Sequence, residues 1–331
     1  MKYRNMGKHG MRLSEVSLGA WLTYGNSVEQ DTTEKCIHEA FNQGINFIDV
    51  ADIYAKGKAE IAVGKVLKEE NQPRKDLVIS SKVFWPLTNN VNDTGLSRKH
   101  IMDSIDGTLE RFGLDYLDIY FCHRWDPYTP LEETILAMDD LIKSGKIHYW
   151  GTSVWSAAQL ERAIGIAKEL GAHAPSVEQP RYNMLDRHIE LEIMETTKYH
   201  GMGIVPWSPL AQGFLTGKYK KDVIPDDSRA KQKDFMKFLE GYFTDDFFSK
   251  ISKLEEISKE LDVKLSQLAL SWALRRNEIS SVITGATKIE HVQENVKATE
   301  IYLTKDILVR IDEILDNIPK LHPIYRPSRN L

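Results

Sequence analysis

The sequence predicts an α/β protein, a TIM-type (β/α)8 barrel with an N-terminal β-hairpin and extra C-terminal helices. Short apolar or β-branched runs recur at fairly even intervals, and amphipathic helical patterns fill the gaps between them. No strand is followed by the G-x-G-x-x-G turn that an open dinucleotide-binding sheet normally carries. Eight such units without a break in composition favour a closed barrel over a doubly wound sheet.

The predicted strands are short and apolar, as expected for strands buried on both faces of a parallel sheet. They cover residues 16–21, 47–51, 77–83, 116–123, 147–154, 176–179, 203–209 and 280–286. Amphipathic patterns predict helices over residues 33–43, 98–112, 131–143 and 157–170. A glycine follows each of these helices at the place of a left-handed C-cap: Gly44, Gly113, Gly145 and Gly171.

Some segments stand outside the repeat, although we expect residues 1–331 to form a single barrel domain. Residues 3–13 predict a hairpin that turns at Lys8, His9 and Gly10 and covers the N-terminal end of the barrel. Residues 213–261 exceed a normal βα connection and predict a long functional loop with an inserted helix. Beyond the last strand, residues 290–298 and 306–318 predict helices, and the tail 321–331 is either loose or folded over the barrel mouth.

Composition and charge restrict the class of partner. A net charge of -5, without long runs of one sign, argues against nucleic acid or an anionic membrane surface, so a small molecule is expected. Cys36 and Cys122 are too few for a disulfide framework and have no CxxC spacing, which fits a reducing cytosol and excludes a structural zinc site. No leader-like or membrane-spanning apolar stretch is present, so we expect a cytoplasmic protein without membrane insertion.

Polar side chains near the ends of three successive strands form the strongest candidate site. Asp49 interrupts an apolar strand, Lys82 lies near the end of the next, and His123 closes the one after. Tyr54 follows the first of these strands by a few residues. Because the carboxyl ends of barrel strands converge on one volume, we expect these four side chains to meet there.

The residue types suggest acid–base chemistry. Lys82 can supply the cation that a buried Asp49 carboxylate needs, and the same ammonium is expected to lower the pKa of Tyr54. Such a tyrosine can act as a general acid near neutral pH, an effect worth about 10²- to 10⁴-fold in rate. His123, if neutral, can donate an N–H to a substrate oxygen and fix its orientation.

Each of these residues also has a purely structural interpretation. Asp49 and Lys82 can form an ion pair that only stabilises the barrel, Tyr54 can simply pack, and His123 can be a satisfied core group. Asp49 and His123 can also be metal ligands, but each is isolated from the paired ligands that a closed set requires. We therefore expect no metal site.

Motifs along nearly the whole chain are similar to one known family. They include "FIDVADIYAKGKAE", "SSKVFW", "GLSRKHI", "FCHRWDPYTPLEET", "YWGTSVWS", "VEQPRYN", "PWSPLAQGFLTGKY" and "GATKIEHVQEN". Together they resemble the aldo-keto reductases, and in particular the branch that contains the β subunits of voltage-gated potassium channels. The motifs occur in the family's order.

The resemblance implies an enzyme that reduces aldehydes and ketones by hydride transfer from NADPH. The family's four catalytic residues fall on Asp49, Tyr54, Lys82 and His123, with Tyr54 as general acid. The residues implied for cofactor binding are Trp21, Asp49, Ser153, Gln179, Trp207, Ser208, Pro209, Leu210, Ala211, Gln212, Lys218, Arg229, Gly285, Thr287, Lys288, His291, Glu294 and Asn295.

Within this set the resemblance implies a division of roles. Ser153 and Gln179 would bind the nicotinamide carboxamide, and Trp207 would stack on the nicotinamide ring. The loop 208–212 would follow the pyrophosphate, with positive charge added by Lys218 and Arg229. The remaining residues, from Gly285 to Asn295, would bind adenosine and the 2'-phosphate. Each group also has a structural alternative. The loop can be an ordinary Pro-bearing turn, the two cations can be solvated charges, and the residues near Asn295 can belong to a plain helix face.

Three positions depart from the family pattern. His123 stands where the resemblance implies an asparagine in channel β subunits, which favours catalysis over slow redox sensing. Val154 replaces a polar residue, which removes one carboxamide contact. Gly285 and His291 stand where many family members have Lys and Arg, so a preference for NADPH depends on Thr287, Lys288 and Arg229.

A second interpretation is a cofactor-sensing subunit that docks on a membrane channel and turns over little. Because the resembled subunits form fourfold rings, a homo-oligomer, a tetramer or higher, is expected in this case. A metal-dependent barrel hydrolase is a third alternative. For a reductase, small carbonyl compounds are the expected substrates, within an aromatic mouth formed by Trp21, Tyr24, Trp85, Trp125 and Trp155.

Overall fold

Eight parallel strands form the centre of the protein in the computed structural model, which describes residues 1–21, 24, 29–69, 73–220 and 242–320. Their order in the sheet is β10, β3, β4, β5, β6, β7, β8 and β9. The bounds are β3 Val16–Gly19, β4 Phe47–Asp49, β5 Val78–Val83, β6 Leu117–Cys122, β7 Ile147–Thr152, β8 Val177–Glu178, β9 Gly203–Ile204 and β10 Val282–Thr284. Each lies within one predicted strand, so the predicted succession is confirmed.

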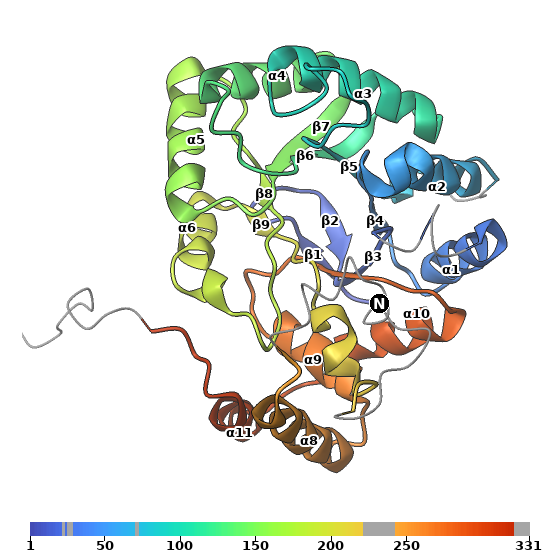
Figure 1. Ribbon diagram of the computed structural model, residues 1–331, viewed down its shortest axis with the longest axis vertical. Helices are drawn as coiled ribbons and strands as arrows, with labels where there is room; N and C mark the ends of the chain where they lie inside the picture. The colour runs from blue at the N-terminus through green and yellow to red at the C-terminus, as the bar shows by residue number, and fades with distance from the viewer. Residues whose placement is uncertain (22–23, 25–28, 70–72, 221–241, 321–331) are drawn as a thin grey trace, which may run out of the picture.

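Isolated bridges bring the two outermost strands of this sheet together. Ile204, at the end of β9, pairs with Ile279, and Trp207 pairs with Ile283 in β10. The Ser280 N–H donates to the Ile204 carbonyl at 2.8 Å. The parallel sheet therefore curls round on itself, and Figure 1 shows its strands surrounded by helices. This arrangement confirms the predicted α/β barrel class.

Helices follow the strands as the sequence predicts. Residues 98–112, 131–143 and 157–170 are helical over the predicted bounds, and Gly113, Gly145 and Gly171 near their ends have positive φ angles, which glycine adopts with the least strain. The α-helices are α1 Gln30–Asn42, α2 Lys58–Glu69, α3 Arg98–Phe112, α4 Leu131–Lys143, α5 Ala157–Leu170, α6 Ile193–His200, α8 Asp245–Glu260, α9 Leu265–Leu274, α10 Ile289–Val296 and α11 Lys305–Leu315. Short 3-10 helices are η1 Tyr54–Gly57, η2 Arg74–Asp76, η3 His188–Glu190, η4 Ala211–Thr216 and η7 Lys297–Glu300.

Two apolar clusters form the core. The larger one joins the outward faces of the strands to the surrounding helices. The smaller one takes its buried side chains from the strands and the N-terminal hairpin, and none from an α-helix: Met6, Leu13, Phe47, Val78, Ile119, Phe121, Val177, Val205 and Ile283. This second cluster is the filled interior of the barrel.

The predicted hairpin is present as β1 Tyr3–Asn5 and β2 Arg12–Ser14, which pair antiparallel. Its turn contains the predicted Lys8, His9 and Gly10, and its left-handed residue is Gly7. A Cβ on Gly7 would lie 2.3 Å from the Gly201 carbonyl oxygen. The Lys8 N–H donates to that same oxygen at 2.8 Å, so the hairpin is fixed at the residues that lead into β9. It therefore covers the amino-terminal end of the barrel.

The long segment 213–261 is only partly a loop. Its last part is α8, which contacts α9 and α11, and these helices lie together at the lower edge of Figure 1. The helix expected inside this segment therefore belongs to the packed body. Residues 221–241, which include Arg229, and the tail 321–331 lie outside the described residues. The extra C-terminal helices predicted over 290–298 and 306–318 are present as α10, η7 and α11.

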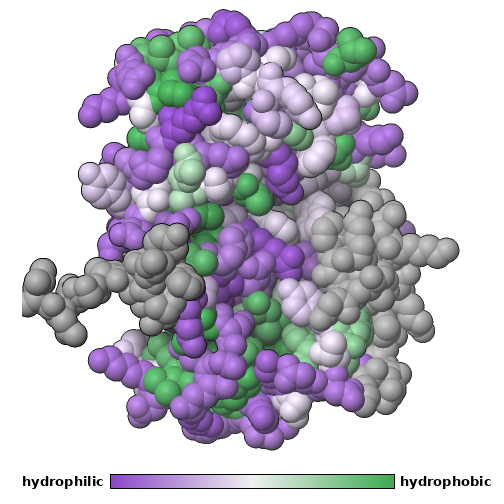
Figure 2. All heavy atoms as spheres, turned by 60° about the vertical axis from the view of Figure 1, so that its left-hand side comes forward, coloured by the Kyte–Doolittle hydropathy of each residue, from purple (hydrophilic) through white to green (hydrophobic). Residues whose placement is uncertain are grey.

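The surface mixes polar and apolar residues. On the face drawn in Figure 2, hydrophobic residues form small patches between hydrophilic ones. Within the ranges that the structure describes, no helix is both long and apolar enough to cross a bilayer.

Candidate active site

The four candidate catalytic residues lie at the carboxyl ends of neighbouring strands. Asp49 is the last residue of β4, Lys82 is in β5, and His123 directly follows β6. Tyr54 opens η1, a short distance after β4. Since β4, β5 and β6 pair in register, the fold brings these side chains together as the sequence predicts.

Asp49 and Lys82 form the buried ion pair that the sequence predicts. Lys82 Nζ lies 2.7 Å from Asp49 Oδ2, and their side chains are 0% and 4% exposed. Ser80 Oγ and Gln179 Nε2 donate to the other carboxylate oxygen at 2.7 and 2.9 Å, and Lys82 also donates to the Val50 carbonyl. Every lone pair and proton of a buried pair needs such partners, so this pair is well satisfied.

Tyr54 lies between the ammonium and the imidazole. Lys82 Nζ is 4.9 Å from the centroid of the Tyr54 ring, and the His123 ring packs edge-on against it with centroids 5.9 Å apart. The Tyr54 hydroxyl forms no hydrogen bond with a described residue. Ala55 and Lys56 adopt left-handed φ angles of 48° and 53°, a strained backbone of the kind found at functional sites.

One prediction about Tyr54 is wrong. The ammonium was expected to lower its pKa, but burial raises the pKa of Tyr54 well above its ordinary value, and the Asp49 carboxylate raises it further. Burial also lowers the pKa of Lys82, against the opposing effect of Asp49. The phenol is therefore protonated at neutral pH, because the free-energy cost of burying a phenolate exceeds the stabilisation that the nearby cation gives it.

His123 is neutral in this environment. Its side chain is buried, and burial lowers its pKa well below the ordinary value, with Lys82 and Arg124 adding to the effect. Its Nδ1 atom is buried and has no hydrogen-bond partner among the described residues. Since buried polar atoms are nearly always paired, this nitrogen fits a site that receives a polar ligand.

The residues expected around a nicotinamide ring lie close to this group. Ser153 Oγ donates to the Gln179 carbonyl at 3.0 Å, and the Gln179 amide reaches Asp49. Trp21 and Trp207 meet edge-on with centroids 6.1 Å apart, and both are partly exposed. The two predicted carboxamide-binding residues are thus joined to the catalytic cluster by one hydrogen-bond chain.

The predicted pyrophosphate loop has an unusual backbone. Leu210 lies near the right-handed region, and Ala211 and Gln212 follow with left-handed φ angles of 47° and 58°. Right-handed to left-handed successions of this kind form concave sites for anions, so the loop fits a pyrophosphate. Ser208 is also left-handed, and its hydroxyl and carbonyl accept from Gln212 and Asn183. Pro209 and Lys218 flank this turn.

The residues expected at the adenosine end divide into two groups. Thr287, Lys288 and His291 lie at the start of α10, where the Thr287 N–H and His291 Nδ1 are 3.4 Å apart, and Gly285 precedes them in an exposed position. The Glu294 carboxylate already pairs with Lys264 and Lys297, and Asn295 is buried. Those two residues therefore support the helix in this structure, while the first group is exposed and can reach a ligand.

Comparison with known proteins identifies the family. Residues 15–316 match the Aldo/keto reductase family. The chain belongs to this family. It is 43% identical to a probable voltage-gated potassium channel subunit beta of Arabidopsis thaliana, and the match covers 98% of this chain and the whole of that protein. A probable subunit of the same name from Oryza sativa subsp. japonica is 41% identical, with the same coverage of both chains. A putative subunit of Schizosaccharomyces pombe is 42% identical over 96% of the chain and 94% of that protein.

Members of the aldo/keto reductase family generally use NAD(P)H. In this aldo/keto reductase the partnerless His123 nitrogen, the partly exposed Trp207 and the left-handed loop fit such a cofactor. No three His, Cys, Asp or Glu side chains of the described ranges gather into a group that could bind a metal.

Arg124 is a site residue that the sequence argument missed. Its Nη1 donates to the His123 carbonyl and lies 3.5 Å from Ser153 Oγ. Burial lowers its pKa, and its charge acts on both Tyr54 and Lys82. The sequence did contain a signal for Arg124, because a cation that directly follows a predicted barrel strand must lie at the mouth of the barrel.

Glu178 is a second missed residue of this aldo/keto reductase. It is fully buried in β8, where it accepts from Thr152 Oγ1 and from the Trp155 N–H, and burial raises its pKa to about 7. These bonds hold the turn at Val154, which has a left-handed φ of 60° and directly follows Ser153. The sequence signal for Glu178 was a carboxylate inside an otherwise apolar strand.

The aromatic wall expected at the mouth needs a correction. Tyr24 and Trp155 are each 1% exposed, so neither can line an open substrate site. Trp155 instead supports Trp125 from below, with their ring centroids 4.7 Å apart. Trp85, at 39% exposure, together with the partly exposed Trp21 and Trp125, remains available to a substrate.

Proposed function

We propose that this aldo/keto reductase reduces aldehydes and ketones to alcohols with NADPH, with Tyr54 as general acid. The observation that carries the proposal is the position of Tyr54 between the Lys82 ammonium, 4.9 Å from its ring centroid, and the edge of the His123 ring. A proton donor, a fixed cation and a neutral imidazole then face one small volume.

Each residue has a distinct task in this proposal. Burial keeps Tyr54 protonated, so its O–H can donate to the carbonyl oxygen. Lys82, held by Asp49, stabilises the negative charge that develops on the phenol oxygen during donation. His123, kept neutral, donates one ring N–H to the carbonyl oxygen and orients it for attack.

The cofactor would supply the hydride. We propose that Ser153 and Gln179 hold its carboxamide, Trp207 packs on its ring, and residues 208–212 with Lys218 bind its pyrophosphate. At the other end Gly285, Thr287, Lys288 and His291 would bind adenosine, with Arg229 adding charge. Lys288 at the start of α10 favours a phosphate, because the helix N-terminus and the ammonium both attract anions. This supports NADPH over NADH.

The proposed substrates are small carbonyl compounds, and the proposed compartment is the reducing cytosol. The exposed Trp85 ring and the partly exposed Trp125 ring offer an apolar wall that distinguishes one methylene by only about 1 to 3 kcal/mol, so a broad range of substrates is expected. Two free, buried cysteines, Cys36 and Cys122, support the compartment.

A matched pair of tyrosine variants tests the proposal. Purified protein should consume NADPH when given a reactive small aldehyde, and Tyr54→Phe should lose about 10²- to 10⁴-fold in kcat while fluorescence titration shows unchanged NADPH binding. Tyr199→Phe, on a side chain that is 84% exposed, should keep full activity. Full activity in Tyr54→Phe would remove Tyr54 from the acid role.

A second function is supported by three relatives that match this chain over nearly its full length and are named probable or putative voltage-gated potassium channel subunits beta. In this case the protein would bind NADPH, assemble as a tetramer and dock on a channel with little turnover. Light scattering together with a panel of carbonyl substrates separates the two functions. A tetramer with negligible turnover on every substrate would favour the regulatory one.

A further inference from the structure

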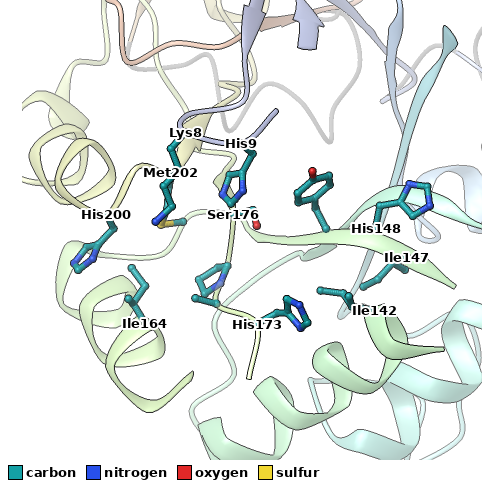
Figure 3. A pocket seen from close by; sticks show the side chains of 13 residues that line it. Lys8, His9, Ile142, Ile147, His148, Ile164, His173, Ser176, His200 and Met202 are labelled. Atoms are coloured by element: carbon teal, nitrogen blue, oxygen red, sulfur yellow. The ribbon is translucent and has the colours of Figure 1, made fainter. Parts of the chain in front are cut away.

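A cavity lies at the amino-terminal end of the barrel, away from the candidate active site. Its volume is about 590 Å³, within the range of small-molecule sites. Figure 3 shows the side chains around it, which come from the hairpin turn, α4, β7, α5, the segment before β8 and the end of α6. The residues are Lys8, His9, Ile142, Ile147, His148, Tyr149, Ile164, His173, Ala174, Pro175, Ser176, His200 and Met202.

The charge of this lining has one sign. Lys8 and the four histidines His9, His148, His173 and His200 are basic, and none of the described lining residues is an Asp or Glu. Ser176 and Tyr149 add hydroxyl groups to the wall. A concave site with basic and hydroxyl groups and no carboxylate in its wall attracts an anion.

Carboxylates that do not line the cavity accept hydrogen bonds from two of the histidine rings, and a third carboxylate lies near His148. Asp139 Oδ1 lies 2.7 Å from His173 Nδ1, and Glu161 Oε2 lies 2.9 Å from His200 Nε2. Asp118 lies 3.6 Å from His148 Nδ1. A ring that donates one N–H to a carboxylate presents its other nitrogen as an acceptor when neutral and as a donor when protonated. Protonation therefore converts the wall into a set of N–H donors.

His9 completes the upper wall from the hairpin turn. Its ring packs edge-on against Tyr149 with centroids 5.4 Å apart, and burial and the neighbouring Lys8 lower its pKa. Burial therefore disfavours the protonated form of the His9 ring in the absence of an anion. Two further cations pair with the carboxylates beside the wall: Lys143 pairs with Asp139 behind His173, and Arg74 pairs with Asp118 beside His148.

The cavity is held in shape by backbone contacts. The Lys8 N–H donates to the Gly201 carbonyl at 2.8 Å, which fixes the hairpin turn to the end of α6. The Trp150 indole donates to the His173 carbonyl at 2.8 Å, and the His173 N–H donates to Asp139 at 2.9 Å. The segment before β8 is therefore fixed at both its backbone and its ring, and little reorganisation is needed to bind a ligand.

The rest of the wall is apolar. Ile142, Ile147, Ile164, Pro175 and Met202 contribute aliphatic or thioether surface beside the basic groups. A bare inorganic anion would leave this surface in water, whereas an anion with an attached apolar group would cover it. Burial of an aromatic ring or short alkyl chain adds affinity that charge alone does not supply.

We propose that this cavity binds a small organic anion, a carboxylate or a phosphate monoester that carries an apolar group, and binds it more tightly at lower pH. The anionic group lies among the Lys8 ammonium and the imidazoles of His173 and His200, and the apolar group lies against Ile142, Ile164 and Met202. The site does not depend on the proposed reductase activity.

Benzoate and phenyl phosphate test this proposal when each is titrated into the full chain by calorimetry at about pH 6 and about pH 8. Benzoate, which is ionised at both pH values, should bind about tenfold more tightly at the lower pH, because each imidazole that gains a proton adds positive charge to the wall. Benzyl alcohol and inorganic phosphate, which each lack one half of the proposed ligand, should bind at least about tenfold more weakly. Benzoate and phenyl phosphate together report which anionic group the site prefers.

Substitutions locate the binding. His173→Gln and, separately, Lys8→Gln should each weaken benzoate binding about fivefold or more at the lower pH. His188→Gln is a matched control, because His188 Nδ1 also pairs with an aspartate at 2.7 Å but lies outside the cavity. It should leave binding unchanged, as should Tyr54→Phe at the opposite end of the barrel. Circular dichroism at each pH shows whether the variants are folded.

Either of two outcomes would overturn the proposal. One is an affinity for benzoate that is the same at the two pH values. The other is affinity that neither His173→Gln nor Lys8→Gln reduces, which would place the anion elsewhere, such as at the candidate active site. The two substitutions lie on different segments, so a folding defect in one leaves the other informative.

Discussion

At the scale of single residues, the Asp49–Lys82 pair combines a structural and a chemical role. Both groups are buried, and Ser80 and Gln179 supply the hydrogen bonds that such a pair needs. An uncompensated buried charge is far more costly than a paired one. The structural and catalytic interpretations of this pair are therefore both compatible with its geometry.

Lys82→Met should destabilise the protein by about 3 to 5 kcal/mol, because Asp49 would remain buried without its cation. Urea unfolding at neutral pH measures the loss. The double variant Asp49→Leu/Lys82→Met, which removes both charges, should recover a large part of that stability while staying inactive. If the single variant were as stable as the wild type, the pair would not be essential to the fold.

Glu178 makes stability depend on pH. Burial raises its pKa from the ordinary 4.5 to about 7 in the folded state. The folded state thus favours the protonated carboxyl, so its contribution to stability is complete below pH 4.5 and is lost as the pH rises through 7. The full change is about 3 kcal/mol.

Glu178→Gln, which stays neutral, should therefore lose less stability than the wild type between pH 4.5 and pH 8, and the difference should approach about 3 kcal/mol. Urea midpoints across this range measure it. Glu169→Gln on the exposed face of α5 is the control and should follow the wild-type profile. If the stability of Glu178→Gln and that of the wild type changed with pH in parallel, the raised pKa of Glu178 would be contradicted.

At the scale of elements, close packing of α2 on α3 depends on one glycine. A Cβ on Gly64 in α2 would lie 2.4 Å from the carbonyl oxygen of Phe112, the last residue of α3. Backbone atoms cannot rotate away as the end of a side chain can. Helix propensity favours alanine over glycine by about 1 kcal/mol, but overpacking costs about 1 to 3 kcal/mol or more.

Gly64→Ala should therefore be destabilising, with a net loss of about 1 to 2 kcal/mol in the free energy of unfolding. Gly165→Ala is the matched control in α5, because Gly165 is exposed and a Cβ there would meet no atom within 4 Å. That variant should be stabilised by up to about 1 kcal/mol. Thermal unfolding should show a lower midpoint for Gly64→Ala and a higher midpoint for Gly165→Ala. Equal shifts of the two midpoints would contradict the close contact at Gly64.

At the scale of the whole molecule, the hairpin and the barrel interior share one core. Met6 and Leu13 are fully buried with side chains from strands around the ring. The larger cluster joins strands and helices from the first third of the chain to the last. We therefore propose that residues 1–331 form a single domain that unfolds in one step.

Met6→Ala should lower the free energy of unfolding of the entire protein by about 2 to 5 kcal/mol, because it leaves a cavity in the barrel interior. Far-UV circular dichroism and tryptophan fluorescence should report the same shifted urea midpoint. Leu136→Ala, on a side chain that is 41% exposed, should change the midpoint much less. Two separate transitions would contradict the single-domain proposal.

Local sequence patterns predicted the helices more accurately than they predicted the pKa of Tyr54. Residues 98–112, 131–143 and 157–170 are helical over their predicted bounds, because amphipathic spacing and left-handed glycine caps act within a few residues. The pKa of Tyr54 was predicted with the wrong sign, because burial depends on the atoms that surround a group in space. Neighbouring sequence carries no measure of that burial.

The sequence by itself determined the succession of strands and helices, the barrel class and the meeting of Asp49, Tyr54, Lys82 and His123, because strand period and strand ends are local properties. Only the tertiary structure decided the hydrogen bonds that Ser80 and Gln179 donate to Asp49, the burial of Glu178, Tyr24 and Trp155, the place of Arg124 and the basic cavity under the hairpin. Each of these depends on contacts between segments far apart in the chain, and a burial cost or a hydrogen bond exists only once those segments meet.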